Sequence, residues 1–212
     1  MYTSRHRTRI KIIYMNLDKY KCIIFDLDGT LINSMIAHAA AWEKTCTTFD
    51  IPYEKEWLNQ LGGMPTRKVT IEIINRYNLE LNADLITQDK ISNFESIAFK
   101  GDTIPGIYQI LKDNYLTKKI GIGTGAQRKH AQEILDTTDI LTMVEVLVTS
   151  DEVVNHKPSP DTFLSVAQQL NTPANQCVVF EDTKIGKQAA IAAGMDCYLV
   201  NNGNILEFCP AT

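Results

Sequence analysis

Short apolar runs alternate with amphipathic segments through the second half of this 212-residue chain. The apolar runs are rich in Val and Ile, which favour strands, and the segments between them repeat apolar positions at helical spacing. We predict strands over 119–123, 145–149, 177–180 and 196–200, and helices over 105–116, 127–136, 159–170 and 184–193. This alternation predicts an α/β fold with a parallel sheet covered by helices on both faces.

An earlier apolar run, 22–25, is too short for a helix and predicts the first buried strand of the same sheet. The stretch 33–102 that follows contains no strand-like run. Its helical patterns cover 34–49, with Ser34 placed as the N-cap, 54–60, 66–78 and 83–99. We therefore predict an α/β catalytic core from 18–32 and 103–212, interrupted by an α-helical cap over 33–102.

Residues 1–17 are predicted to be an N-terminal extension outside this fold. Basic side chains between Arg5 and Lys11 precede a short apolar run. That run lacks the length and the small-residue cleavage site of a signal peptide. We expect a frayed tail, or a start assigned ahead of the true first residue, Met15.

Two aspartates follow the first predicted strand, at the carboxyl edge of the sheet. The strand runs into Asp26-Leu27-Asp28-Gly29-Thr30, and side chains two positions apart lean to the same side of an extended chain. Such close carboxylates repel each other unless a cation or a shared proton compensates. Mg²⁺ prefers oxygen ligands, and a carboxylate held beside it can attack phosphorus. Taken alone, the stretch is equally compatible with a simple Asp-Gly turn.

The strand predicted over 119–123 leads into Thr124 and Gly125, whose hydroxyl and backbone N–H can hold a phosphate oxygen. The same stretch also fits a loose dinucleotide-binding pattern, Gly-x-Gly-x-x-Ala over 121–126. That pattern requires an acidic residue at the end of the next strand, and the strand predicted over 145–149 ends without one. We therefore favour the phosphate site.

Three more charged residues lie at or just after predicted strand ends. Lys157 lies in a loop that two prolines brace, which favours a fixed position over an ordinary solvated lysine. Glu181 and Asp182 follow the strand over 177–180. Two consecutive acids can simply cap the next helix, but together with Asp26 they complete an oxygen-rich site for Mg²⁺.

These motifs, in their order along the chain, resemble those of the haloacid dehalogenase-like hydrolases, and the resemblance covers residues 21–200. It is closest to the β-phosphoglucomutase-like subgroup, which includes bacterial sugar-phosphate phosphatases. The resemblance implies a Rossmann-like sheet with an inserted helical cap. It implies that Asp26 is the nucleophile and Asp28 the general acid/base. The implied holders of the phosphoryl group are Thr124, Gly125 and Lys157, and the implied ligands of Mg²⁺ are Asp26, Asp28 through its backbone carbonyl, Glu181 and Asp182.

Residues of the predicted cap are implied to meet the substrate. His38 lies ten residues after Asp28, where the subgroup keeps a histidine, and Lys90 aligns with a cap lysine. The stretch 61–67 resembles the cap substrate loop. Thr66 falls about where the mutase has a phosphate-gripping arginine, and Arg67 follows it, which places that grip in question.

The resemblance implies hydrolysis of a small phosphorylated sugar, of hexose phosphate, fructose-1-phosphate or 6-phosphogluconate type, through an aspartyl-phosphate intermediate. The nearest alternative is a β-phosphoglucomutase, in which a bisphosphorylated sugar replaces water as the acceptor. A non-enzymatic phospho-receiver or binding module is more distant, because receivers lack both the Asp-x-Asp pair and a helical insertion such as 33–102.

Composition narrows the partners and the compartment. The formal net charge is −4 without a basic excess, so neither nucleic acid nor an anionic membrane is expected as a partner. The five cysteines are scattered, and none forms a Cys-x-x-Cys pair, which favours a reducing, cytoplasmic setting. We expect a monomer whose partner is its small-molecule substrate.

Overall fold

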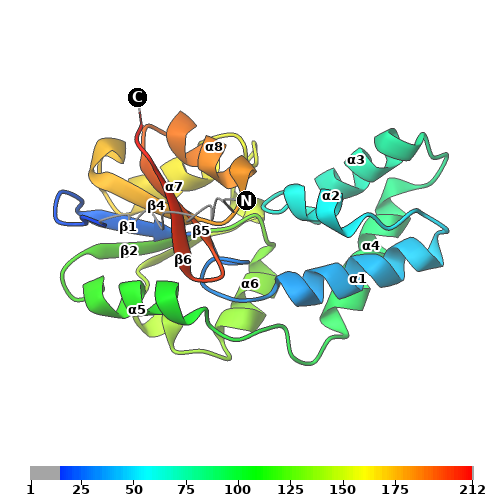
Figure 1. Ribbon diagram of the computed structural model, residues 1–212, viewed down its shortest axis with the longest axis horizontal. Coiled ribbons are helices and arrows are strands. Elements are labelled where there is room, and N and C mark those ends of the chain that lie inside the picture. Colours follow the sequence, from blue (N-terminus) through cyan, green and yellow to red (C-terminus); the bar gives the residue numbers. More distant parts are fainter. Residues whose placement is uncertain (1–14, 212) are drawn as a thin grey trace, which may run out of the picture.

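The computed structural model describes residues 15–211, so the tail predicted over 1–14 lies outside the described residues. Within them, six strands form one sheet in the order β3-β2-β1-β4-β5-β6 (Figure 1). The strands are β1 (Cys22–Phe25), β2 (Lys119–Gly123), β3 (Val146–Val148), β4 (Cys177–Glu181), β5 (Asp196–Asn201) and β6 (Asn204–Cys209). Because β1 lies between β2 and β4, the chain reverses its direction of travel across the sheet at β1, where open α/β sheets bind ligands.

The first five strands are parallel, as predicted, but the strand over 196–200 is not the last. β6 pairs antiparallel with β5 after a tight turn at Asn202 and Gly203, which both have positive φ. Two such residues form the turn that best joins antiparallel strands. The Asn-Gly pair in the sequence was the signal for this hairpin, and the prediction missed it.

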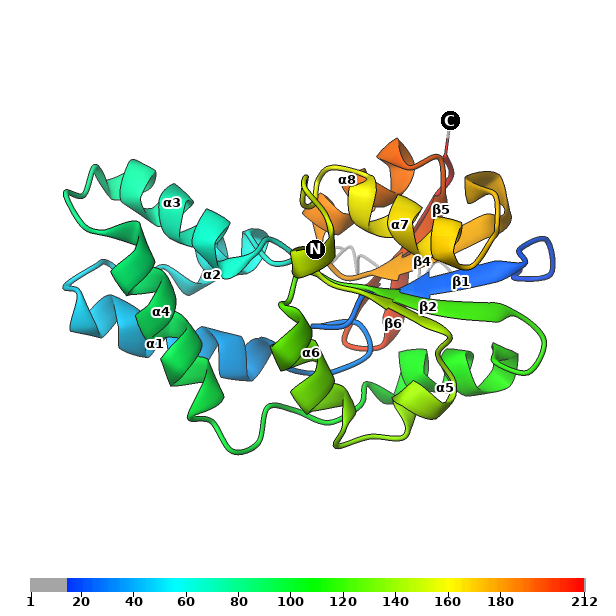
Figure 2. The same ribbon diagram turned by 180° about the vertical axis from the view of Figure 1, so that it is seen from behind.

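Four helices cover the sheet, two on each face. They are α5 (Pro105–Asn114) and α6 (Arg128–Leu135) on one face, and α7 (Asp161–Gln169) and α8 (Lys184–Ala192) on the other (Figures 1 and 2). Short 3₁₀ turns lie between strands and helices at Ile140–Thr142, Ser150–Glu152 and Ala174–Gln176. All the regular elements predicted for this half of the chain are present, with ends that differ by one or two residues.

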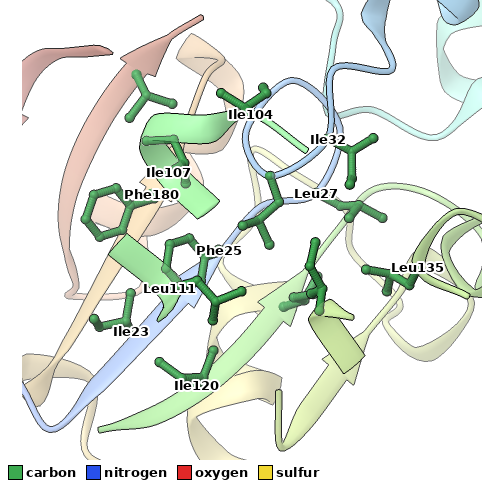
Figure 3. Close-up of a cluster of buried hydrophobic side chains, with 14 of the residues drawn as sticks. Ile23, Phe25, Leu27, Ile32, Ile104, Ile107, Leu111, Ile120, Leu135 and Phe180 are labelled. Carbon is green, nitrogen blue, oxygen red and sulfur yellow. The ribbon is translucent and has the colours of Figure 1, made fainter. Parts of the chain in front are cut away.

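Alternate residues of each strand pack on opposite faces, as the two-residue period of a strand requires. Phe25 of β1 and Phe180 of β4 stack with ring centroids 5.3 Å apart on the face covered by α5. Figure 3 shows these rings near Ile107 and Leu111 of that helix. Ile24 points to the other face, into the cluster beneath α7 and α8.

Residues 33–102 hold four helices and no named strand, as predicted. They are α1 (Met35–Thr48), α2 (Lys55–Gln60), α3 (Thr66–Tyr77) and α4 (Ala83–Glu95). These helices, here called the cap helices, lie beyond one end of the sheet (Figure 1) and share a separate apolar cluster around Trp42, Leu58 and Ile73. The last helix ends at Glu95, four residues before its predicted end.

The described chain joins the sheet earlier than the predicted core begins. Leu17, which the sequence assigned to the extension, is buried in the same apolar cluster as Phe25. Among residues 15–211, no helix has the length and apolar character needed to cross a membrane.

Candidate active site

Asp26, at the end of β1, lies at the centre of a buried ion cluster. Its Oδ1 atom accepts a 2.7 Å hydrogen bond from Nζ of Lys157, which also donates to Oε1 of Glu181 at 2.9 Å. Burial by itself lowers the pKa of Lys157, but the two carboxylates reverse this and raise the pKa above its ordinary value. The lysine is therefore a fixed ammonium, and its loop position is held by charge as well as by prolines.

Glu181 is held by donors on both of its carboxylate oxygens. Oε2 accepts from the backbone N–H and the hydroxyl of Thr183, at 2.5 and 2.8 Å, while Oε1 faces Lys157. A Cβ atom at Gly186 would overlap this carboxylate, so the glycine in the first turn of α8 makes room for it. The geometry therefore makes Glu181 an anchor for Lys157.

Asp182 is the acid of this cluster that has no hydrogen bond from Lys157. Its Oδ1 atom accepts a 3.3 Å hydrogen bond from the hydroxyl of Thr30, and Gly29 leaves space beside it. Burial, followed by the charges of Glu181 and Asp26, raises the pKa of Asp182 well above its ordinary value. This carboxyl thus lacks a charge partner of its own.

The cluster fits a divalent cation. Carboxylate oxygens of Asp26, Glu181 and Asp182 lie within 4.8 Å of one another. Two like charges about 4 Å apart repel by about 4 kcal/mol at an effective dielectric constant of about 20. One ammonium, that of Lys157, cannot balance three carboxylates, and their oxygen atoms are the donors that Mg²⁺ prefers.

We expect the metal-free protein to lose stability between about pH 4 and pH 7, and Asp26→Asn to remove part of that loss. Burial is the main cause that raises the pKa of Asp26 from 3.8 to about 7, with Lys157 opposing it. The folded chain therefore holds this proton more tightly than the unfolded chain. The resulting stabilisation is complete below pH 3.8 and is lost as the pH rises through about 7.

Melting curves in a chelating buffer measure this effect. The melting temperature of Asp26→Asn relative to wild type should rise by about 5–10 °C between pH 4 and pH 8. A relative melting temperature that stays constant over this range contradicts the raised pKa.

Thr124 and Gly125 lie at the end of β2, beside the end of β1. Thr124 is buried, and its hydroxyl accepts a 3.0 Å hydrogen bond from the N–H of Ala126. A Cβ atom at Gly125 would overlap the carbonyl of Gly63, so the loop between α2 and α3 touches this strand end. Gly121 is the first glycine of the dinucleotide-like pattern. It lies against Val166 of α7, where a Cβ atom would overlap that side chain.

Asp28 is held by two cap residues, and a third contacts one of them. Its Oδ1 atom accepts a 2.5 Å hydrogen bond from the hydroxyl of Ser34 and lies 3.5 Å from Nε2 of His38. Nζ of Lys90 lies 2.9 Å from Nδ1 of the same histidine. Ser34 was predicted as an N-cap of α1, but its hydroxyl makes no capping hydrogen bond and serves Asp28 instead.

The charges in this second group are also shifted by burial. Burial alone raises the pKa of Asp28, but hydrogen bonds from His38 and Ser34 outweigh it and lower the pKa below its ordinary value. Burial lowers the pKa of Lys90 to about 8. Burial and the charge of Lys90 likewise lower the pKa of His38.

A cavity of about 320 Å³ lies between the cap helices and the strand ends. The predicted site residues that line it are Asp26, Asp28, His38, Arg67, Lys90, Thr124 and Gly125. Lys157, Glu181 and Asp182 do not line it, but Lys157 bonds to Asp26, which does. Much of the remaining wall is apolar, from residues such as Trp42, Leu58 and Met64.

Arg67 lines this cavity, but its guanidinium is engaged elsewhere. Nε donates a 3.0 Å hydrogen bond to Asp84, and both side chains are more than half exposed. Thr66, the residue before it, begins α3. The predicted loop therefore presents a hydroxyl and a solvated arginine at this point.

A family model described as haloacid dehalogenase-like hydrolase matches residues 23–200. The chain belongs to the haloacid dehalogenase-like hydrolases. Fructose-1-phosphate phosphatase of Escherichia coli is 31% identical over 179 residues, which are 84% of this chain and 95% of that protein. β-Phosphoglucomutase of Bacillus subtilis is 28% identical over 193 residues, which are 86% of this chain and 84% of that protein.

A solved structure of a hydrolase from Pseudomonas syringae is similar to this one, with a TM-score of 0.77 and 25% sequence identity. The match covers 86% of this chain and 85% of that chain. The family and the α/β fold predicted from the sequence are thus confirmed. Several relatives are named as phosphatases, so the protein is an enzyme of this class. This excludes the non-enzymatic alternatives.

Several residues of this haloacid dehalogenase-like site were not predicted. Ser34 and Thr183 supply hydroxyls to Asp28 and Glu181, and Phe94 packs on His38. Each was assigned a helical role or none, because a capping or core residue has the same local pattern. Their partners are distant in sequence or lie across a turn, so only the fold reveals the contact.

Proposed function

We propose that this protein hydrolyses the phosphate monoester of a small sugar, with Asp26 as the nucleophile and Mg²⁺ as the cofactor. The observation that carries the proposal is that two aspartates line one cavity and have different charged neighbours. Asp26 is paired with a fixed ammonium, and Asp28 is paired with a histidine–lysine pair. Two carboxyl groups with such different neighbours suit two different roles, and Mg²⁺ bound beside Asp26 would hold this nucleophile in its ionised form against the effect of burial.

In the first step, a carboxylate oxygen of Asp26 attacks phosphorus, and the bond from phosphorus to the sugar oxygen breaks. Asp28 gives its proton to the leaving sugar oxygen. In the free protein the pKa of Asp28 is low, but a phosphate dianion beside it disfavours the ionised form and helps load the proton. In the second step, Asp28 takes a proton from the water that hydrolyses the aspartyl-phosphate.

The phosphoryl oxygens need donors that stay in place as charge shifts. Thr124 offers its hydroxyl and Gly125 its N–H at the end of β2. Lys157 has a third N–H that its two carboxylate partners leave available. Fixed donors in a buried site stabilise the charge that develops in the transition state, and they do not have to reorganise. This stabilisation is the largest contribution to the rate of many phosphoryl transfers.

Mg²⁺ would be held by Asp26, Asp182 and the backbone carbonyl of Asp28, with Glu181 in support. When bound, the ion neutralises the acid cluster and withdraws charge from a phosphoryl oxygen. The unbalanced charge of Asp182 is the feature of the chain that favours this ligand set.

The cap helices would close the cavity over the sugar. The loop between α2 and α3 reaches Gly125, and His38 and Lys90 bring polar groups to a wall that is otherwise mainly apolar. Apolar walls with a few placed polar groups are typical of small-molecule sites. The name of the Escherichia coli relative, fructose-1-phosphate phosphatase, makes that ester a first candidate substrate, beside other hexose phosphates and 6-phosphogluconate.

We expect inorganic phosphate, not an isomeric sugar phosphate, as the main product. A mutase must grip a second phosphate in its cap, and a free arginine fork suits that task. Here Thr66 offers a hydroxyl, and Arg67 is paired with Asp84 at the surface. The assay is release of phosphate from fructose-1-phosphate and from β-glucose-1-phosphate, with and without the glucose bisphosphate.

Asp84→Ala removes the acceptor that pairs with Arg67 and is a useful companion variant. If wild type produced glucose-6-phosphate faster than free phosphate, the mutase function would replace the one proposed here. Arg67→Gln would then test whether that arginine grips the second phosphate.

A further inference from the structure

The cavity between the cap helices and the sheet carries few charges beyond the two aspartates that follow β1. Among the described residues that line it, the permanent cations are Arg67 and Lys90, and the one further acid is Asp151. The alcohol part of a substrate would meet this wall once its phosphate is held at the ends of β1 and β2. The surroundings of these three charges therefore decide which alcohols fit.

The ammonium of Lys90 has little open space around it. Its Nζ atom lies 2.9 Å from Nδ1 of His38, and 4.8 and 5.7 Å from the ring centroids of Phe94 and Trp42. The whole residue is 3% exposed. A second anion on a substrate would have to displace one of these neighbours before it could pair with this lysine.

The other cation, Arg67, already has an acid beside it. Its Nε atom donates a 3.0 Å hydrogen bond to Oδ1 of Asp84, which lies in the first turn of α4. An exposed pair of this kind contributes little to stability, but the acid offsets the positive charge of the arginine at the wall. A second anion would have to compete with Asp84 for this guanidinium.

The acid in the wall makes the balance more negative. Oδ2 of Asp151 accepts a 2.6 Å hydrogen bond from the backbone N–H of Arg128, at the start of α6. A backbone N–H carries no formal charge, so this bond leaves the charge of the carboxylate in place. An anionic group on a substrate would be repelled by it.

The histidines of the wall do not reverse this balance. His38 faces an acid, and Nε2 of His130 lies 3.3 Å from Oε1 of Glu95. Burial, followed by the charge of Lys68, lowers the pKa of His156 below its ordinary value, so its ring is uncharged at neutral pH.

Much of the wall that remains is apolar. Trp42, Leu58 and Met64 line the cavity and belong to the apolar cluster of the cap helices or pack against it. An anion placed against such side chains loses its water without gaining a partner, which is costly unless a cation compensates. A neutral alcohol loses far less on entering the same space.

We propose that the alcohol part of the substrate is uncharged, so that the protein takes phosphate monoesters of neutral alcohols and rejects esters that carry a carboxylate or a second phosphate. Asp84 is then a specificity-determining residue, because it occupies the more accessible of the two cations that line the cavity in the described chain. The inference rests on the proposed function and narrows it. It places hexose monophosphates ahead of 6-phosphogluconate and of sugar bisphosphates.

Two pairs of esters test the proposal on the wild-type protein. Glucitol-6-phosphate and 6-phosphogluconate are both open chains, and they differ at C1, where the second has a carboxylate. Fructose-1-phosphate and fructose-1,6-bisphosphate share the ester at C1, and the second has another phosphate. In each pair, kcat/KM for phosphate release should be higher for the ester of the neutral alcohol by about tenfold or more.

Substitutions that change the charge of the wall test its cause. Asp84→Ala should raise the ratio of kcat/KM for 6-phosphogluconate to kcat/KM for glucitol-6-phosphate about threefold, because it leaves Arg67 without its acid. Glu72→Ala is the matched control and should keep the wild-type ratio. Glu72 is an exposed acid on α3, the helix of Arg67, and does not line the cavity.

Met64→Lys adds a cation to the wall and should raise the same ratio about tenfold. Met64→Gln, which has a similar length and no charge, should keep the wild-type ratio. Each ratio compares two esters on one protein sample, so a loss of folded protein cancels from it.

Equal cleavage of the two members of both pairs by wild type would overturn the inference and leave the proposed function standing. An unchanged ratio in Asp84→Ala would overturn the role of Asp84. An unchanged ratio in Met64→Lys, or an equal rise in Met64→Gln, would overturn the role of charge in the wall. Failure of the proposed function gives a different result, since wild type then releases phosphate from none of the four esters, and this inference fails with it.

Discussion

Replacing Asp26 by Asn should reduce turnover of every phosphate ester to below a thousandth of the wild-type rate. The substitution keeps the side-chain size but removes the carboxylate that would attack phosphorus and that faces Lys157 at 2.7 Å. Neutralising it also leaves the acid cluster with less charge for a cation. The measurement is kcat for fructose-1-phosphate and for p-nitrophenyl phosphate at saturating Mg²⁺.

Asp113→Asn is the matched control for this prediction. Asp113 lies exposed on α5, where it accepts a hydrogen bond from Gln109. It neither lines the cavity nor belongs to the acid cluster. It should keep wild-type kcat. Asp26→Asn protein that retained more than a tenth of the wild-type rate would rule out this nucleophile, and trapped phosphate on another residue would identify the true one.

Asp28→Asn should slow hydrolysis of a sugar phosphate by about 10²–10⁴, the usual contribution of a general acid/base. The amide keeps the acceptor for Ser34 and His38 but carries no transferable proton. Binding of Mg²⁺ should change little, because the expected contact of Asp28 is its backbone carbonyl, which the substitution spares.

Calorimetric titration with Mg²⁺ and steady-state kinetics separate these two effects. Ser34→Ala is the comparison, since it removes a donor to Asp28 without removing the acid; it should cost far less than Asp28→Asn. Loss of Mg²⁺ affinity in Asp28→Asn would show that the side chain, not the backbone, serves the metal. Full activity on a sugar phosphate would remove Asp28 from the acid/base role.

In the proposed mechanism, the two groups of charged residues give the two aspartates different roles at one strand end. Asp26 has an ammonium and two further acids around it, whereas Asp28 has a hydroxyl, an imidazole and a more distant ammonium. Burial is common to both, so the neighbours decide the direction of each pKa shift.

The sequence by itself was enough to predict the five parallel strands of the sheet and the four cap helices. Apolar runs and helical periods are local, and each motif residue follows a strand whose carboxyl end must lie at one edge of a parallel sheet. That rule places Asp26, Thr124 and Asp182 together although 156 residues separate the first from the last.

Tertiary structure alone decided what each side chain meets at that edge. The hydroxyl of Ser34, at the N-cap of α1, bonds to Asp28, Glu181 has both oxygens occupied, and Phe94 stacks on His38. The local sequence around a serine, a glutamate or a phenylalanine is the same whether its side chain has a structural role or contacts a site residue. The choice depends on partners that chain folding brings from other elements, and no spacing along the sequence encodes those distances.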